Sequence, residues 1–132
     1  MIDRVATGIK TKFTGSALAD LVTGIFFGEA PALIELPYLM FFDISNLPDS
    51  TFEKDGEFYR IQFSIFVQER SIVADNGLKE IYEALRTLYD NATLTLTGWT
   101  NYQCRFLSQH NQPTVNKVLH RTVDYEIRAE KT

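Results

Sequence analysis

The sequence predicts an α+β fold, an antiparallel-dominated sheet with an N-terminal helix and a central amphipathic helix packed on one face. Two observations carry this prediction. Residues 59–67 alternate apolar and polar side chains, a period of two that is typical of a strand with one dry face. Residues 74–89 then repeat apolar side chains every three or four positions, as an amphipathic helix does. Laying this helix across that strand buries both apolar surfaces, and each large side chain contributes about 1.5–3 kcal/mol when fully buried.

The central helix has a recognisable start and end. Ser71 is suited to cap its N-terminus, and Asn91 is suited to the left-handed conformation that ends a helix. Its apolar stripe consists of Ala74, Leu78, Ile81, Tyr82, Leu85, Leu88 and Tyr89. In the preceding strand, Phe58 and Phe66 are apolar exceptions on the face that otherwise carries polar side chains.

Before this pair, the chain is expected to form a helix and two strands. Residues 2–13 place apolar side chains at helical spacing, and residues 17–22 form a further short turn. Residues 25–27 are expected to form a short strand and residues 36–44 a longer one. Residues 38–42 are apolar on both faces of that second strand. Such a strand needs two covers, for which the domain's own helices and a neighbouring chain are the candidates.

After the central helix, residues 93–97, 102–108 and 117–128 are expected to form strands. The last strand points Leu119, Val123, Tyr125 and Ile127 inward, with Arg121 as the one break. Its outward side carries His120, Thr122, Asp124, Glu126 and Arg128, which indicates a wet face. Two polar stretches, residues 46–56 and 109–116, are expected to be loops.

Length and composition limit the possible functions. The 132 residues suit one domain spanning residues 1–132. A net charge of -4 and a pI of about 5.1 argue against a general nucleic-acid binder, which needs a basic face. The single cysteine, Cys104, excludes an intramolecular disulfide framework and fits a reducing compartment. No apolar run approaches the roughly 18 residues that span a bilayer, so we expect a soluble protein with no membrane partner.

The aromatic residues are numerous for a domain of this size, with ten Phe and six Tyr. That many large rings can exceed the capacity of one core and leave some for a subunit interface, where aromatic side chains are enriched. Burial in the core remains the more common role for any single ring.

The residues that could carry catalysis form no recognisable constellation. Cys104 lies in an apolar alternation, which is typical of a small buried hydrophobe rather than a thiolate. His120 and Asp124 are about 13 Å apart by strand rise, too far for a direct hydrogen bond. Two isolated histidines do not give metal-ligand spacing, and the glycines match no phosphate-binding motif. We therefore predict no catalytic residue, no metal site and no cofactor.

The order of these elements resembles that of the tail completion, or tail terminator, proteins of long-tailed bacteriophages and prophages. The resemblance covers nearly the whole chain, and its parts are Ala30-Pro31, Pro37-Tyr38, the 59–69 strand, the 74–88 helix, residues 94–98 and the closing 118–127 strand. It implies a non-enzymatic structural protein that assembles into a ring, usually a hexamer, at the head-proximal end of the tail tube. The ring stops tube polymerisation and provides the surface to which the filled head joins.

The resemblance also implies partners and a location. The partners are further copies of the chain, the tail tube protein and the head-tail connector proteins, while DNA passes through without specific binding. The location is the virion tail, after assembly in the host bacterial cytoplasm. Candidate residues for the subunit interface are Leu39, Met40, Phe41, Phe42 and Phe66. Candidate residues for partner binding, in the two polar loops, are Pro48, Phe52, Lys54, Asp55, His110 and Pro113.

Two other functions are compatible with the sequence. The first is a neighbouring neck component, such as a head-tail connector or stopper, which gene order would separate from a terminator. The second is a small α+β ligand-binding domain or enzyme with a pocket between helix and sheet, for which His120, Asp124 and Tyr125 are the residues to watch. A deep pocket with convergent polar groups would favour that second function.

Overall fold

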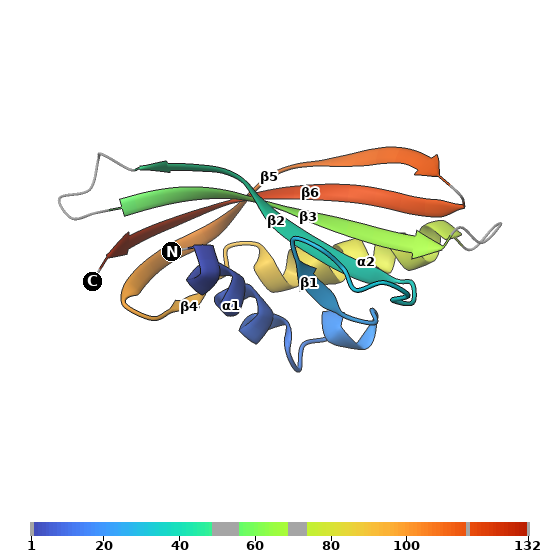
Figure 1. Ribbon diagram of the computed structural model, residues 1–132, viewed down its shortest axis with the longest axis horizontal. Helices are drawn as coiled ribbons and strands as arrows, with labels where there is room; N and C mark the ends of the chain where they lie inside the picture. Colours follow the sequence, from blue (N-terminus) through green and yellow to red (C-terminus); the bar gives the residue numbers. More distant parts are fainter. Residues whose placement is uncertain (1, 49–55, 69–73, 116, 132) are drawn as a thin grey trace.

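The computed structural model describes residues 2–48, 56–68, 74–115 and 117–131, and within them six strands form one sheet. Both helices lie on the same face of that sheet (Figure 1). The elements in chain order are α1 (Ile2–Phe13), the 3-10 helix η1 (Leu18–Asp20), β1 (Ile25–Phe27), β2 (Tyr38–Pro48), β3 (Gly56–Gln68), α2 (Ala74–Tyr89), β4 (Thr95–Leu96), β5 (Trp99–Val115) and β6 (Val118–Lys131). The predicted α+β class, with two helices on one face of a mostly antiparallel sheet, is confirmed.

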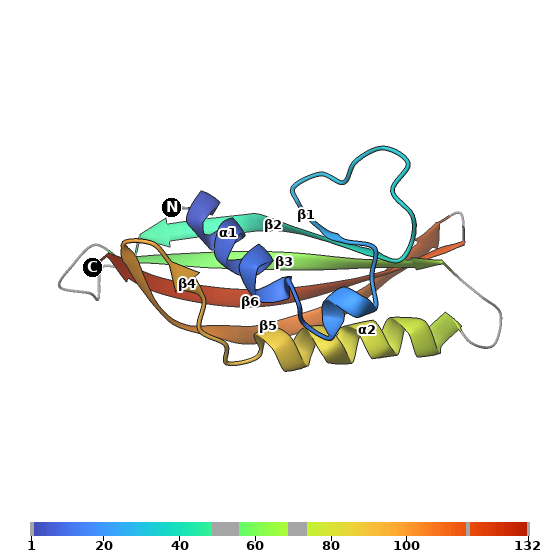
Figure 2. The same ribbon diagram turned by 90° about the horizontal axis from the view of Figure 1, so that it is seen from below.

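The strands are arranged in the order β1-β2-β3-β6-β5-β4. β1 pairs with β2 in parallel, and each of the other neighbouring pairs is antiparallel. The long strands β2, β3, β6 and β5 run side by side, with α1 crossing them and α2 lying along the β5 side (Figure 2). At the centre, β3 pairs with β6 along its whole length, from Gly56 opposite Glu130 to Gln68 opposite Val118.

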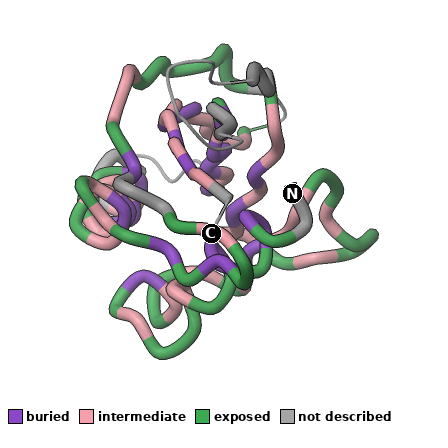
Figure 3. Tube along the Cα trace, turned by 90° about the vertical axis from the view of Figure 1, so that its left-hand side faces the viewer, coloured by how far each residue is buried: buried purple, intermediate pink, exposed green. Residues whose placement is uncertain are grey.

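The core lies between the helices and the inner face of the sheet, and in Figure 3 the buried segments gather toward the middle of the molecule. Phe63 of β3 stacks on Tyr89 of α2 and meets the ring of Tyr125 edge-on, with centroid distances of 4.9 Å and 5.7 Å. The Tyr89 hydroxyl donates a 2.8 Å hydrogen bond to the carbonyl oxygen of Ile9, which ties α2 to α1. Asn91, just beyond α2, has φ +58, the left-handed conformation expected at this position. Ser71 lies outside the described residues.

Helix α1 approaches β4 closely because residue 8 is glycine. A Cβ at this position would lie 3.1 Å from both the carbonyl oxygen of Thr95 and Cδ2 of Leu96. The missing side chain therefore lets the helix backbone rest on the strand. None of the helices in the described part of the chain is long and apolar enough to cross a membrane.

Two predicted loops are wrong in extent. Residues 109–115 continue β5 and pair with β6 up to Val115 opposite Val118. β2 likewise continues through Pro48, and β3 begins at Gly56, so less of the 46–56 stretch remains for a loop. Residues 109–114 are all exposed, so their polar side chains lack the alternation of buried and wet positions that indicates a strand.

The outer face of the sheet is not uniformly wet as predicted. Ser64 and Thr122, which lie opposite each other on β3 and β6, are each only 4% exposed. The Thr122 hydroxyl lies 3.4 Å from the carbonyl oxygen of His110 and accepts a 3.3 Å hydrogen bond from Gln112. Pairing with neighbouring strands thus satisfies this hydroxyl even though it is buried.

Candidate functional site: assembly surfaces of the sheet

The apolar strand β2 divides its interface candidates between two faces. Leu39 and Phe41 are fully buried in the core, where Phe41 contacts the rings of Phe27 and Phe63 at 5.2 Å and 5.8 Å. Met40 and Phe42 are partly buried and point to the opposite face. Within the described residues, neither helix covers that outer face (Figure 1). Of these four residues, Met40 and Phe42 are therefore the two that a neighbouring chain could reach.

Phe66 belongs to a row of rings that crosses the outer face near one end of the sheet. Its ring stacks between those of Tyr38 on β2 and His120 on β6, with centroid distances of 5.0 Å and 4.3 Å. Phe26 on β1 meets Tyr38 edge-on at 6.3 Å. We call Phe26, Tyr38, Phe66 and His120 the ring ladder. Each of these four rings contacts another ring of the ladder, and each side chain is only partly buried.

His120 is the polar end of the ring ladder. Burial lowers the pKa of its imidazole below the ordinary value. Its Nε2 atom is buried and has no hydrogen-bond partner among the described residues. Burial of the imidazole therefore favours its neutral form.

The partner-binding candidates are dispersed over the sheet. Pro48 is the last residue of β2, with its backbone opposite Glu57. His110 and Pro113 are exposed, and both belong to β5 rather than to the predicted loop. Phe52, Lys54 and Asp55 lie outside the described residues. The described candidates therefore do not converge on one site.

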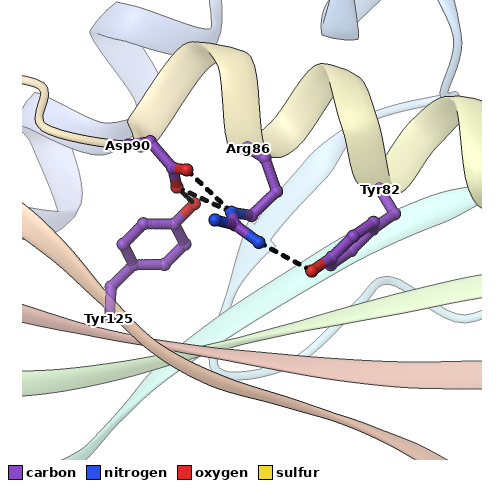
Figure 4. A network of polar contacts seen from close by, with 4 residues as sticks. All are labelled: Tyr82, Arg86, Asp90 and Tyr125. Atoms are coloured by element: carbon purple, nitrogen blue, oxygen red, sulfur yellow. Dashed lines mark hydrogen bonds and ion pairs between the residues drawn. The ribbon is translucent and has the colours of Figure 1, made fainter.

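A polar network that the sequence did not predict joins α2 to the inner face of the sheet (Figure 4). The Nε of Arg86 donates to both carboxylate oxygens of Asp90, at 2.9 Å and 2.8 Å, and Nη1 donates to the Tyr82 hydroxyl at 2.8 Å. The guanidinium lies 3.5 Å from the ring centroid of Phe106. From β6, the Tyr125 hydroxyl donates to Asp90 at 2.5 Å. These contacts fix the C-terminal part of α2 over β5 and β6.

The pKa shifts agree with a network that keeps its protons. Burial, reinforced by the hydrogen bond to Asp90, raises the pKa of Tyr125. Burial lowers the pKa of Arg86, but hydrogen bonds to Tyr82 and Asp90 outweigh it, and the net pKa lies above the ordinary value. Tyr82, Arg86 and Asp90 are spaced four residues apart, which was the available signal for one helix face. Beside them lies a depression of about 500 Å³ that is largely open to solvent, a poor match to a deep ligand pocket.

The potentially catalytic groups do not meet. His120 and Asp124 point to the outer face of β6, whereas Tyr125 points to the inner face and is fully buried. Asp124 accepts hydrogen bonds from Gln62 at 2.9 Å and Ser108 at 3.4 Å, so it is held by neighbouring strands. Burial raises the pKa of Cys104 to about 12, which leaves its thiol protonated and unreactive at neutral pH.

The described residues contain no group of three or more His, Cys, Asp or Glu side chains that could hold a metal ion. Of the three residues named for the ligand-binding alternative, His120 and Asp124 lie on the outer face of β6 and Tyr125 lies on the inner face.

Comparisons with known proteins give one family match and two solved chains of similar fold. The family model described as tail completion protein gp17 matches residues 13–130. A solved chain from a structure titled "Virion of native gene transfer agent (GTA) particle" has 19% sequence identity and a TM-score of 0.68, covering 95% of this chain and 92% of that chain. A second solved chain has 15% identity and a TM-score of 0.52, covering 100% of this chain and 96% of that chain. At these identities the likeness shows a shared fold. No curated protein matches this chain.

Proposed function

We propose that this chain, which belongs to the tail completion protein gp17 family and is a structural protein of the phage tail, forms a ring at the head-proximal end of the tail tube. The ring ends tube polymerisation and presents the surface to which the filled head joins. Its partners are further copies of the chain, the tail tube protein and the head-tail connector proteins. Six copies match a six-fold tail tube.

The observation that carries this proposal is the uncovered outer face of the sheet. Met40, Phe42 and the ring ladder lie there, partly buried, on the side that neither helix covers in the described structure. Neighbouring apolar side chains that stay partly exposed on an uncovered face favour a protein contact there. A contact between two unlike surfaces closes into a ring when its rotation divides a full turn.

The charge of the chain agrees with DNA passing through the ring. A net charge of -4 disfavours the phosphate contacts that dominate nucleic-acid affinity. The proposed location is therefore the virion, at the junction of tail and head, after assembly in the host bacterial cytoplasm.

The experiment is to measure the mass of the purified protein by light scattering over a concentration series, with negative-stain imaging of the same samples. We expect a transition from monomer to a single larger species, seen as rings. The variant Phe42→Asp should suppress this transition and keep a native circular dichroism spectrum. The control Thr11→Asp, on the exposed side of α1, should assemble as the wild type does. A protein that stays strictly monomeric, even with tail tubes present, contradicts the proposal.

A further inference from the structure

The charges of this chain are segregated along the sequence. Residues 13–52 contain no Lys or Arg, and residues 91–123 contain no Asp or Glu. The acidic residues of the first segment are Asp20, Glu29, Glu35, Asp43 and Asp49. The basic residues of the second segment are Arg105, Lys117 and Arg121.

The fold places these two segments on opposite sides of the sheet. The first segment supplies β1 and β2 at one end of the strand order, and the second supplies β5 and β4 at the other end. Figure 2 shows β2 and the β1–β2 connection along one long side and β5 along the other. We call these the acidic side, with Glu29, Glu35 and Asp43, and the basic side, with Arg105 and Lys117; Asp20 in η1, which contacts α2, and Arg121 in β6 lie away from both sides. Helix α2, next to the basic side, carries exposed charges of both signs.

The acidic side is also where large apolar side chains are exposed. In the described part of the chain, the exposed large hydrophobic residues are Leu21, Leu33 and Ile44; the last two lie on the acidic side, in the β1–β2 connection and in β2, whereas Leu21 follows η1. Leu33 is 99% exposed and has a φ of +67, uncommon for a residue of this kind. It is flanked in the β1–β2 connection by the exposed residues Glu29 and Glu35. An exposed apolar residue in a strained backbone between like charges is typical of a binding element.

We propose that copies of this chain assemble head to tail, with the acidic side of one copy against the basic side of the next and Leu33 as the apolar anchor. This inference rests on the proposed ring, because a ring needs two different surfaces that complement each other on the same chain. Opposite charges on the two surfaces steer them together and oppose acidic-to-acidic or basic-to-basic pairing. The partner is thus a second copy of the chain.

The direction of the strands suits this arrangement. β2 is antiparallel to β3, β3 to β6, and β6 to β5, so β2 and β5 run in opposite directions. All copies in a ring about an axis along the strands share one orientation. The β2 of one copy therefore meets the β5 of the next in antiparallel fashion, the geometry of most of this sheet.

On both sides, part of a strand edge has no neighbouring strand within the described residues. β1 pairs with β2 only at Leu39, Met40 and Phe41. On β5, β4 pairs with Trp99 and Thr100, and the backbone of Cys104 bonds to Asn91 and Ala92. Beyond these contacts, residues 42–48 of β2 and 105–115 of β5 have no described strand on their outer side.

The two open stretches overlap in part along the sheet. The register rows from Phe42 to Ser108 and from Ser45 to Arg105 bound the overlap, which is Phe42 to Ser45 on β2 and Arg105 to Ser108 on β5. A further row, from Tyr38 through Phe66 and His120 to Gln112, brings Glu35, before β2, and Lys117, after β5, to the same end of the sheet. Unpaired strand edges of this kind are templates for a strand of another chain.

Charge reversal tests the inference directly. Glu35→Lys or Lys117→Glu should each raise the concentration for half-assembly by at least about tenfold. Carrying both reversals in one chain restores opposite charges across the contact and should bring assembly back to within about threefold of wild type. The controls are Glu80→Lys and Lys79→Glu, which make the same charge changes at exposed positions on α2. Lys117 is exposed in the turn between β5 and β6, so its reversal should leave the fold intact.

Two further measurements make the test specific. Raising the salt from about 0.05 M to about 0.5 M should weaken wild-type assembly, because screening shortens the range of these charges. Leu33→Ser should weaken assembly without lowering the free energy of unfolding, since the side chain is almost fully exposed. Two cysteine variants, Glu35→Cys and Lys117→Cys, should give cross-linked dimers under a bifunctional thiol reagent when the two variants are mixed. Each variant alone should give few, since native Cys104 is buried.

The outcomes separate this inference from the proposed function. Rings that form equally well with Glu35→Lys, Lys117→Glu and the α2 controls would overturn the head-to-tail contact and leave the ring standing. Efficient cross-linking of either cysteine variant with itself would also overturn it, because it would show a two-fold contact. A wild-type chain that forms no ring with or without tail tubes would refute the ring, and this contact with it.

Discussion

Phe41 and Phe42 are adjacent in the sequence and point to opposite faces of β2, so they should respond to mutation in opposite ways. Phe41 is fully buried against Phe27 and Phe63, whereas Phe42 is partly buried on the outer face. We expect Phe41→Ala to destabilise the monomer strongly and Phe42→Ala to do so weakly. For each kcal/mol of unfolding free energy lost, we expect Phe42→Ala to weaken assembly more than Phe41→Ala.

The magnitudes follow from burial. Truncating a buried Phe costs about 3–5 kcal/mol through lost transfer free energy and the cavity left behind. This includes the two ring contacts of Phe41, each worth about 0.5–1.5 kcal/mol. Phe42 has less surface to lose from the monomer core, so its truncation should cost about 1 kcal/mol. Since a typical domain is stable by about 5–15 kcal/mol, only the first change should approach unfolding.

The assay is urea unfolding followed by circular dichroism, at a protein concentration low enough for each variant to be monomeric. Assembly is then measured by light scattering at concentrations where each variant is folded. Equal losses of unfolding free energy for the two variants would contradict the assignment of Phe41 to the core and Phe42 to the outer face. A larger loss for Phe42→Ala would contradict it still more directly.

Removing one hydroxyl or one titrating group should test the remaining contacts. Tyr125→Phe should lower the free energy of unfolding by about 1.5 kcal/mol, and a double-mutant cycle with Asp90→Asn should show that most of this loss is their shared hydrogen bond; additive effects would contradict it. Burial raises the pKa of Cys104 to about 12, so the unfolded state loses its thiol proton first as pH rises. The free energy of unfolding should therefore fall above about pH 8.5. Urea midpoints that fall equally with pH for wild type and Cys104→Ala would refute this. Because burial lowers the pKa of His120, the unfolded state binds its proton first as pH falls below about 6.5; stability should decrease there, and His120→Gln should remove that component in the same titration.

The parts of the fold that follow from the sequence are those where one side of an element is buried and the other is wet. The bounds predicted for α1 and α2 agree with the structure, and the alternation of residues 59–67 lies within β3. In these elements the period of apolar side chains reports directly on the direction of the core.

The segments that sequence patterns missed lack such a contrast. Residues 109–115 are strand because they pair with β6, and their polar side chains show no alternation. The Arg86 network was missed for a different reason. A cation within an amphipathic helix is expected to face water, whereas here the aromatic ring of Phe106 and the carboxylate of Asp90 draw the guanidinium toward the sheet.

Sequence patterns identified candidate surface residues but not the face of the sheet on which each one lies. The apolar stretch 38–42 gave residues on two faces, and only the partner strands decide that Leu39 and Phe41 belong to the core. Phe66 was identifiable as an oddity of an otherwise polar face, but its stacking between Tyr38 and His120 depends on the register of three strands. Long-range pairing of this kind is not encoded in any local window of sequence.

Tail tube growth in the presence of the purified protein tests the central claim most directly. Tail tube protein would be polymerised with increasing amounts of gold-labelled wild-type chain, and tube lengths and label positions measured by electron microscopy. We expect tubes that stop growing and carry label as a ring at one end. Tubes that keep elongating at the same rate under saturating protein, or label spread along their walls, would contradict the role of this chain as the ring that ends the tail.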